Sequence, residues 1–457
     1  GTGFTYHALP SVTALSTAGA VQGAAVTLTG YRFGATQGTS TATFNGNPAT
    51  VLSWSDTSIR AVVPSTATSG NVVVRVNGES SPGVAFTVWA PPASNAAITA
   101  GGYHNSMKLD ARGVPHVVHA SAVDGANLLY TTYNPSTGGW STATIDTNGR
   151  YRHPSIAIDT TGVLHVSAAS GAGVRYLRCD PTGTGTACLA PASWTAVTAI
   201  PLSSGTCGPT SGTTSCADYT SIALTSANSP RIAYYDASDV AGNGCTDAST
   251  ECLKFAAFAA APPWTVEVVD PAPAGGTVGQ FASLAIDPGT NQPHLSYYDG
   301  TGNKRSGNKN LVYATKAGSV WGYFSPATTN DVGHFTSIAL WNGLPRISHT
   351  DITNSAKALD VTTEISLGAW STAAVDSGGV SNVANGGTSI AVGTDGRARV
   401  AYYHGGTGSL RLAQEGAASW GLLTRTTGGF FPSLGLDGLN RGRVAYQNGT
   451  SLAFHAQ

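Results

Sequence analysis

Residues 283–299 read Ser-Leu-Ala-Ile-Asp-Pro-Gly-Thr-Asn-Gln-Pro-His-Leu-Ser-Tyr-Tyr-Asp, and this stretch decides the fold. Apolar and polar side chains alternate on both sides of a turn rich in Pro, Gly and Asn, which predicts two short antiparallel strands. Variants of the pattern occur seven times along the chain. The seven units open at Ser106, Ser155, Ser221, Ser283, Ser337, Ser389 and Ser433, in steps of 49, 66, 62, 54, 52 and 44 residues.

Each unit continues with further strand-like segments. One reads approximately Leu-x-Tyr-Ala, and in six units the next begins with a tryptophan. These tryptophans are Trp140, Trp194, Trp264, Trp321, Trp370 and Trp420. Four short alternating strands per roughly 50 residues is the repeat length of a β-propeller blade. The sequence therefore predicts an all-β fold with a seven-bladed β-propeller over residues 94–457, and no stretch has the 3.6-residue period of a helix.

The two ends of the repeat region predict how the ring closes. The seventh unit stops after three strands, the last at 451–455, and an unpaired strand-like segment at 95–99 precedes the first unit. We expect residues 94–99 to form the outer strand of the seventh blade, because closure removes free sheet edges. The repeat resembles those of bacterial secreted propeller proteins. It lacks the Ser-x-Asp-x-Gly-x-x-Trp box of sialidases and the double glycine of kelch repeats.

The composition excludes several classes of partner. Charged residues are 10% of the 457 residues and the formal net charge is -1, whereas a typical globular chain has about 25% charged residues. Affinity for a nucleic-acid backbone rests on many Lys and Arg side chains, so no nucleic-acid partner is expected. No run of about 20 apolar residues occurs, so no membrane insertion of this chain is expected.

The six cysteines indicate an oxidising compartment. They are Cys179, Cys188, Cys207, Cys216, Cys245 and Cys252, and all lie within 74 residues. Their local spacing favours three disulfides, 179–188, 207–216 and 245–252, although six cysteines allow 15 pairings. A zinc site would need a Cys-x2-Cys-type spacing with a histidine nearby, and these cysteines have neither. Because disulfides persist outside a reducing cytosol, we expect an extracellular or cell-surface protein, and a start at Gly1 without an apolar leader agrees with a processed secreted chain.

Residues 9–88 predict a separate β-sandwich. Strand-like segments at 25–30, 41–45, 58–63, 72–76 and 84–88 alternate with turns, and Asn45-Gly46 and Asn77-Gly78 are hairpin dipeptides. The segments Val26-Thr-Leu-Thr-Gly-Tyr-Arg-Phe-Gly34, Phe44-Asn-Gly46, Trp54-Ser-Asp-Thr-Ser-Ile59, Val63-Pro64 and Ser69-Gly70 follow one another. Together they resemble an immunoglobulin-like IPT/TIG domain, which implies a spacer or an adhesion module. Residues 1–8 then form a tail, and the Pro-rich segment 89–93 forms a linker.

A residue that is cationic, or becomes so on protonation, recurs where the second strand of every unit begins. The set is His116, His165, Arg231, His294, Arg346, Arg399 and Arg443, and Asp110, Asp159, Asp287 and Asp437 close four of the preceding strands. His–Asp pairs suggest catalysis, but a feature present in every blade serves the blade. We expect a charge-assisted hydrogen bond that fixes the first turn. We also expect the Tyr-Tyr pairs and the tryptophans to pack between blades.

Function is expected where the blades differ, at the residues just before each repeat serine and at the end of each second strand. Aromatic, His, Arg and Asp side chains gather there, which suits sugar recognition because rings stack on sugars while polar groups bind hydroxyls. In the sixth and seventh units Gly386-Gly387 and Phe430-Phe431 hold these positions. The predicted ligand-binding residues are Tyr103, His104, Arg152, His153, Asp218, Tyr219, Phe281, His334, Phe335, Asp299 and His404. The alternative is a channel mouth filled by its own side chains.

We expect a non-enzymatic surface protein whose propeller binds a glycan or a protein in adhesion. One alternative is a structural subunit of an extracellular filament or surface layer that self-assembles through the N-terminal tail. The other is a polysaccharide lyase or hydrolase, in which His104, His153, Tyr219, His334 and Arg152 supply an acid, a base and a charge neutraliser. No cofactor is expected. The loops Asp236–Asn243 and Asp299–Asn303 offer oxygen ligands for calcium, but they match neither EF-hand nor nonapeptide spacing.

Overall fold

The computed structural model of the chain is built almost entirely of β-strands. It describes residues 8–457 except 95, 124, 148, 182–186, 202–216, 238–244, 246–250, 260–263, 273–275, 302–308, 330, 354–356 and 381–385. Within these residues the only helical segments are two 3-10 turns, Ala187–Leu189 and Pro191–Ser193. The prediction of an all-β fold is confirmed.

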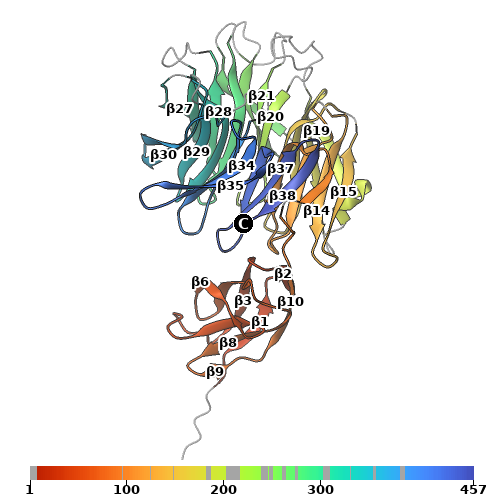
Figure 1. Cartoon of the computed structure of the whole chain (residues 1–457), viewed down its shortest axis with the longest axis vertical. Helices are drawn as coiled ribbons and strands as arrows, with labels where there is room; N and C mark the ends of the chain where they lie inside the picture. The colour runs from red at the N-terminus through yellow and green to blue at the C-terminus, as the bar shows by residue number, and fades with distance from the viewer. Residues whose placement is uncertain are drawn as a thin grey trace, which may run out of the picture.

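Two sheets form the N-terminal sandwich, the red and brown body at the bottom of Figure 1. One sheet has the order β1 (Ser11–Leu15), β3 (Ala25–Tyr31), β7 (Ser58–Val62) and β6 (Thr50–Trp54). The other has the order β2 (Gly19–Val21), β10 (Val84–Trp89), β8 (Gly70–Val76), β4 (Thr41–Phe44) and β5 (Asn47–Pro48), with β9 (Glu79–Ser80) beside β8. Val26 and Leu28 of β3 and Val72 and Val74 of β8 are fully buried in one core. Alternate residues of facing strands thus fill the space between the sheets.

Both predicted hairpin dipeptides of the sandwich form tight turns. Asn45-Gly46 joins β4 to β5 with φ angles of 45° and 78°, and Asn77-Gly78 joins β8 to β9 with φ angles of 50° and 92°. Positive φ at both central residues is the type I′ geometry that matches the twist of paired strands. Strand β10 extends to Trp89, which therefore pairs within the sandwich, one residue into the predicted linker.

Seven four-stranded antiparallel sheets follow in the described part of the chain, one for each repeat unit, and they are numbered here as blades 1 to 7 (Figure 1). The strands of each blade are given from the channel outward. Blade 1 consists of β12 (Tyr103–Leu109), β13 (Pro115–Ala120), β14 (Leu128–Asn134) and β15 (Gly139–Asp146), and blade 2 of β16 (Arg152–Ile158), β17 (Leu164–Ser170), β18 (Gly173–Cys179) and β19 (Trp194–Pro201). Blade 3 consists of β20 (Ala217–Leu224), β21 (Pro230–Asp236), β22 (Cys252–Phe258) and β23 (Trp264–Pro271).

Blades 4 to 7 repeat this layout. Blade 4 consists of β24 (Val278–Ile286), β25 (Pro293–Asp299), β26 (Asn310–Ala317) and β27 (Val320–Ala327), and blade 5 of β28 (Val332–Trp341), β29 (Leu344–Asp351), β30 (Ala358–Ser366) and β31 (Ala369–Asp376). Blade 6 consists of β32 (Thr388–Val392), β33 (Ala398–His404), β34 (Ser409–Glu415) and β35 (Trp420–Thr427). Blade 7 consists of β36 (Phe430–Leu436), β37 (Gly442–Asn448), β38 (Ser451–Ala456) and β11 (Ala96–Ala100). The outer strand of blade 7 is therefore the segment that precedes blade 1, as the sequence predicts.

The innermost strands form a closed ring. Each packs against the innermost strand of the next blade, and β36 of blade 7 packs against β12 of blade 1. Strand β11 pairs antiparallel with β38, from Ala96 opposite Phe454 to Ala100 opposite Ser451. The strand from one end of the repeat region thus completes the sheet at the other end, which leaves no blade with a missing strand.

The repeat serines join the blades to one another. The hydroxyl of each serine accepts a hydrogen bond from a backbone N–H on the innermost strand of the next blade. The seven donors are Ile156, Ile222, Leu284, Ile338, Ile390, Leu434 and Met107, at 2.9 to 3.3 Å. The last of these bonds runs from Met107 in blade 1 to Ser433 in blade 7, across the closure. Each bond satisfies a buried backbone donor, worth about 1 kcal/mol net.

Aromatic side chains fill the space between blades, as predicted for the tryptophans. Trp194 of blade 2 lies edge-on to Tyr130 of blade 1, with ring centroids 5.4 Å apart. Trp264 and Tyr176 form the next such pair at 5.2 Å. Trp140 of blade 1 contacts Phe454 of blade 7 at 5.3 Å, so the same packing continues across the closure. The first two pairs have the edge-to-face geometry that aromatic rings prefer, and the third is tilted.

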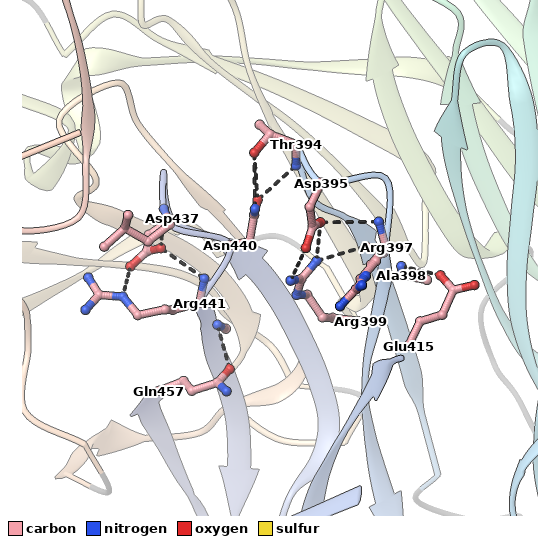
Figure 2. A network of polar contacts seen from close by, with 12 residues as sticks. Thr394, Asp395, Arg397, Ala398, Arg399, Glu415, Asp437, Asn440, Arg441 and Gln457 are labelled. Carbon is pink, nitrogen blue, oxygen red and sulfur yellow. Dashed lines mark hydrogen bonds and ion pairs between the residues drawn. The ribbon is translucent and has the colours of Figure 1, made fainter. Parts of the chain in front are cut away.

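The recurring His, Arg and Asp residues fix turns. Asp437 accepts hydrogen bonds from the backbone N–H and the side-chain Nε of Arg441 (Figure 2). It also accepts from the backbone N–H of Leu439, and Arg443 reaches the same carboxylate at 2.9 Å. The equivalent residues of blade 1 lie 3.5 Å apart, from His116 Nε2 to Asp110 Oδ2. The structural role predicted for this set is confirmed here. In blade 4 His294 bonds to the Tyr313 hydroxyl at 2.6 Å, as His116 and His165 bond to tyrosines of their own blades. Its Nε2 atom, however, has no partner among the described residues, and Asp287 fixes the turn without it.

Two of the three predicted disulfides lie within the described residues. Cys179 is bonded to Cys188 and Cys245 to Cys252, as their spacing predicts. Cys207 and Cys216 lie outside the described residues. The tail at residues 1–7 also lies outside them, as do Asn243 and Asn303 of the two loops considered for calcium.

The sandwich docks on the face of the propeller that carries the turns between first and second strands. The N–H of Val21 donates to the carbonyl of Arg112 in blade 1 at 2.9 Å, and the N–H of Gly438 in blade 7 donates to the carbonyl of Gly23 at 2.8 Å. The sandwich therefore contacts the two blades that flank the closure. A Cβ atom at Gly438 would lie 2.8 Å from that carbonyl oxygen and 3.1 Å from Val62, so glycine permits this close approach.

We expect Gly438→Val to separate the sandwich from the propeller, because its side chain would occupy the space of the Gly23 carbonyl. The radius of gyration measured by small-angle scattering should rise, and cleavage of the 89–94 segment by a protease should become faster. Gly171→Val is the matched control, since nothing lies within 4 Å of a Cβ at Gly171. An unchanged radius of gyration for Gly438→Val would contradict the role of the contact between Gly438 and Gly23 in holding the sandwich against the propeller.

Candidate functional site

The candidate site lies where the innermost strands begin, at the end of the propeller remote from the sandwich. In six blades the residue two positions before the repeat serine is aromatic and has a left-handed backbone. These residues are His104, His153, Tyr219, Phe281, Phe335 and Phe431, with φ between 40° and 56°. Each lies in a β-bulge, where the pairing with the second strand shifts register.

The bulge explains why these side chains gather at one place. An extra residue in one strand turns a side chain away from the regular alternation of the sheet and bends the strand. A left-handed backbone costs a residue with a side chain about 1–3 kcal/mol, and such strain is concentrated at functional sites. Here six bulky residues accept that conformation at equivalent positions, and all six line one cavity at the channel.

The six rings contact one another in sequence around the channel. His104 and His153 have centroids 4.0 Å apart, and His153 and Tyr219 4.3 Å. Tyr219 and Phe281 follow at 4.7 Å, and Phe281 and Phe335 at 4.6 Å. On the other side His104 contacts Phe431 at 4.5 Å. We call this set the aromatic ring of the channel.

One sector of the aromatic ring has no side chain. Blade 6 places Gly387 at the equivalent position, so Phe335 and Phe431 are not bridged by a ring contact in the described residues. The cavity enclosed by the ring has a volume of about 190 Å³, and Gly386 and Gly387 form part of its wall. This volume is smaller than the roughly 300–1,000 Å³ of sites for drug-sized ligands.

Side chains of adjacent blades hold the backbone of the aromatic ring. The hydroxyl of Thr336 donates to the carbonyl of Phe281 at 2.8 Å, and the hydroxyl of Thr388 donates to the carbonyl of Phe335 at 2.8 Å. The amide of Asn105 donates to the carbonyl of Phe431 at 2.8 Å. These bonds fix the strained backbone from the neighbouring blade, which keeps the rings in place.

Arg152 and Asp218 form a charged cluster with His153 of the aromatic ring. The Nδ1 atom of His153 donates to the carboxylate of Asp218, and the Arg152 guanidinium lies 3.6 Å from the same carboxylate. Burial acts to raise the pKa of Asp218, but His153 and Arg152 outweigh it and hold this pKa below its usual value. Burial, with the Asp218 charge beside it, raises the pKa of the Tyr219 hydroxyl. Tyr219 is therefore a neutral hydroxyl at the channel.

Among the described residues, His104 is the one member of the ring with buried polar atoms that lack a partner. Both of its ring nitrogens are buried, and neither has a hydrogen-bond partner among the described residues. Burial lowers the pKa of His104 well below 6.5, and the neighbouring His153 lowers it further. The imidazole is therefore neutral, with one donor and one acceptor nitrogen.

The structure brings five of the eleven predicted ligand-binding residues to the cavity. These are His104, His153, Tyr219, Phe281 and Phe335. Asn105, Gly387 and Phe431 also line it and were not in the predicted set. The sequence places Phe430-Phe431 at this rim, because Phe431 lies two positions before Ser433 as the others do before their serines, but neither residue was among the predicted ligand-binding residues.

The other six predicted residues lie outside the cavity wall. Tyr103 packs on the core between blades 1 and 2, and Arg152 and Asp218 form the supporting cluster. The Nε2 atom of His334 donates to Asp331 at 2.9 Å, Asp299 accepts from the N–H of Thr301 at 3.1 Å, and His404 shares a hydrogen bond with the hydroxyl of Thr407 at 2.9 Å. Five of the six thus form ion pairs or hydrogen bonds with other side chains or backbone groups, and Tyr103 packs on a core.

No group of three or more His, Cys, Asp or Glu side chains with metal-binding geometry occurs among the described residues. Asp236, in one loop considered for calcium, is paired with Lys254. No helix in the described part of the chain has the length and apolar character to span a membrane.

Sequence comparison supports the interpretation of the N-terminal sandwich. Residues 10–88 match the IPT/TIG domain family. The match covers nearly all of the predicted 9–88 segment, and the IPT/TIG domain is the sandwich that docks on blades 1 and 7. No curated protein matches the chain.

The solved structures with a similar fold include a binding protein, a polysaccharide lyase and a lectin. An auxiliary nutrient binding protein from Bacteroides ovatus is 11% identical over 100% of both chains, with a TM-score of 0.41. A polysaccharide lyase is 11% identical over 80% of this chain and 92% of the other, with a TM-score of 0.46. A mutant of the Aleuria aurantia lectin AAL in complex with Fucα1-6GlcNAc is 13% identical over 72% of this chain and 98% of the other, with a TM-score of 0.43. At these scores no function transfers to this chain.

Proposed function

We propose that this chain is an extracellular, non-enzymatic surface protein that binds glycans in the aromatic ring of the propeller channel. The observation that carries the proposal is six strained aromatic residues around one cavity. A sugar has apolar faces and hydroxylated edges, so a cavity that combines aromatic faces with polar atoms suits it. The disulfides in the described residues support an extracellular location.

The position of the IPT/TIG domain is consistent with this role. It docks on the opposite end of the propeller from the aromatic ring, so the channel mouth faces away from it. Further domains or surfaces joined through the N-terminal side would leave the mouth accessible. The assembly of filaments through the tail stays a prediction, because residues 1–7 lie outside the described residues.

A polysaccharide lyase is the second candidate. It is favoured by the contact of His104, His153 and Tyr219 in one arc, with Arg152 and Asp218 behind it. A lyase removes a proton beside a carboxylate, and the substrate carboxylate must be neutralised. Arg152 is paired with Asp218 and does not line the cavity, so the binding role is the better supported of the two.

Glycan binding is expected to fall at least about tenfold in Phe335→Ala, because the variant removes one wall of the cavity, and a tenfold loss corresponds to about 1.4 kcal/mol. A glycan array followed by calorimetry on the bound glycans measures this. Tyr31→Ala is the control, since Tyr31 is 60% exposed on the sandwich. Failure of the folded wild type to bind any glycan would refute the proposal, and release of unsaturated sugars from a uronate polysaccharide would favour the lyase instead.

A further inference from the structure

The cavity of the aromatic ring has two chemically different walls. In a ring of seven blades, blades 4 and 5 lie across the channel from blade 1. Blade 1 supplies His104 and Asn105, whereas blades 4 and 5 supply Phe281 and Phe335. Blades 4 and 5 also supply Ser283, Thr336 and Ser337, but the hydroxyl oxygens of these residues are already hydrogen-bonded to Ile338, Phe281 and Ile390. The wall of blade 1 is therefore the more polar of the two across about 190 Å³ of space.

The polar wall holds three buried atoms without partners in the described residues. They are Nδ1 and Nε2 of His104 and Oδ1 of Asn105. The amide nitrogen of Asn105 is already used, because it donates to the carbonyls of Gly102 and Phe431. Leaving buried polar atoms unpaired costs stability, so three such atoms in two successive residues of the cavity lining leave a hydrogen-bonding demand that a ligand would satisfy.

The hydrogen-bonding pattern of this wall defines what it accepts. A neutral imidazole presents one N–H donor and one acceptor nitrogen, and an amide oxygen is an acceptor only. The wall thus offers one donor and two acceptors. Hydroxyl groups satisfy both kinds, because each donates and accepts. A carboxylate only accepts, so it would bond to one N–H and face two acceptors unfavourably.

The charges around the cavity point in the same direction. None of the described residues that line it is Lys, Arg, Asp or Glu. The guanidinium of Arg152, next in sequence to His153 of the ring, is paired with Asp218. His104 itself is neutral because burial lowers its pKa. No described group at the cavity would neutralise an anionic ligand, and a buried unpaired charge is costly.

We infer that the aromatic ring is a subsite for one neutral sugar ring, whose face packs on Phe281 and Phe335 and whose adjacent hydroxyls bind His104 and Asn105. This rests on the proposed glycan-binding function and adds the charge class of the ligand and the residue that selects it. The small volume admits a single ring, so the sugar is a terminal unit. The sector without a side chain at Gly387 is where the rest of a glycan leaves the ring.

The inference is tested with matched sugars that differ only at C6, where a neutral hydroxymethyl group is exchanged for a carboxylate. Methyl glycosides of glucose, galactose and mannose, and the corresponding methyl uronides, are titrated against the full-length protein by calorimetry and by saturation-transfer NMR. At least one neutral glycoside should bind at least about tenfold more tightly than its uronide, since the uronide loses one or more hydrogen bonds.

His104→Phe separates a binding role from a structural one. The phenyl ring keeps the contacts with His153 and Phe431 but removes both unpartnered nitrogens, so the melting temperature should stay the same or rise by about 1–4 °C. Affinity for the neutral glycoside should fall at least about tenfold. His165→Phe is the control, because both nitrogens of His165 have partners, at 2.7 Å to Tyr176 and 3.4 Å to Asp159. It should lower the melting temperature and leave affinity unchanged.

The outcomes distinguish the two levels of the proposal. Equal or tighter binding of a uronide would overturn the neutral-sugar inference and leave glycan binding in place. Full affinity in His104→Phe would overturn the role of His104. If the folded wild type bound no glycan in any format, the proposed function itself would fail and this inference with it.

Discussion

Gly333→Ala is expected to destabilise the propeller by about 2–4 kcal/mol, through overpacking combined with backbone strain. Gly333 has φ of 98°, and a Cβ atom there would lie 2.6 Å from Cα and 2.8 Å from N of Leu311 in the preceding blade. The obstacle is backbone, which cannot rotate away as a flexible side chain does. The free energy of unfolding in urea, followed by tryptophan fluorescence, measures the effect.

Gly162→Ala is the matched control for this substitution. Gly162 has a similar φ of 94°, but nothing lies within 4 Å of its Cβ position. It should therefore show the cost of the backbone conformation alone, about 1 kcal/mol. If the two variants lost equal stability, the close approach between blades would not be the reason for glycine at 333.

The same close approach occurs at four blade junctions. Gly102, Gly279, Gly333 and Gly429 lie four residues before their repeat serines, all with φ between 86° and 111°. Each would place a Cβ within 3 Å of backbone atoms of a leucine in the preceding blade, namely Leu452, Leu253, Leu311 and Leu410. The Gly333 result is therefore expected to hold for the other three positions.

Ile98→Asp is expected to destabilise the closure of the ring by about 2 kcal/mol, from the loss of apolar burial and the placement of a charge against an apolar cluster. Ile98 lies in β11 and packs against a cluster that includes Met107 of blade 1 and Phe454 of blade 7. Detachment of β11 would leave β38 as an unpaired edge, which templates aggregation. Urea unfolding gives the stability, and light scattering at native conditions detects association.

Ala97→Asp provides the control in the same strand. Ala97 pairs with Ala453 but its side chain is exposed, so an aspartate there should change stability by less than about 0.5 kcal/mol. Equal stability of Ile98→Asp and the wild type would show that the packing of β11 does not secure the ring.

The repeat made most of the fold predictable. Local alternation around each turn defines a hairpin, and its recurrence at seven serines defines the blades. Even the closing strand was predictable, because one unit lacked a strand and one strand lacked a unit. The serine hydroxyls explain the recurrence physically, since each bonds to the next blade and a change at one would leave a buried N–H unpaired.

The candidate site was predictable only in part. The stretch before each serine does line the cavity, yet neighbours in sequence such as Tyr103 and His104 go to different environments, one to a core and one to the channel. Regular alternation cannot assign them, because a bulge shifts the strand between the pair and the serine. Asp299 and His404 are likewise close to the channel in chain position but form bonds within their own loops.

The sequence alone therefore determined the architecture, since period and turn chemistry are local properties that any one repeat displays. It also determined the residue types that could meet at the channel mouth. Only the tertiary structure decided that six rings contact one another, that Gly387 leaves a gap, and that three buried polar atoms of blade 1 have no partner among the described residues. The reason is that these contacts join residues up to 327 positions apart, His104 with Phe431 for example, and their geometry depends on bulges and ring closure rather than on any local pattern.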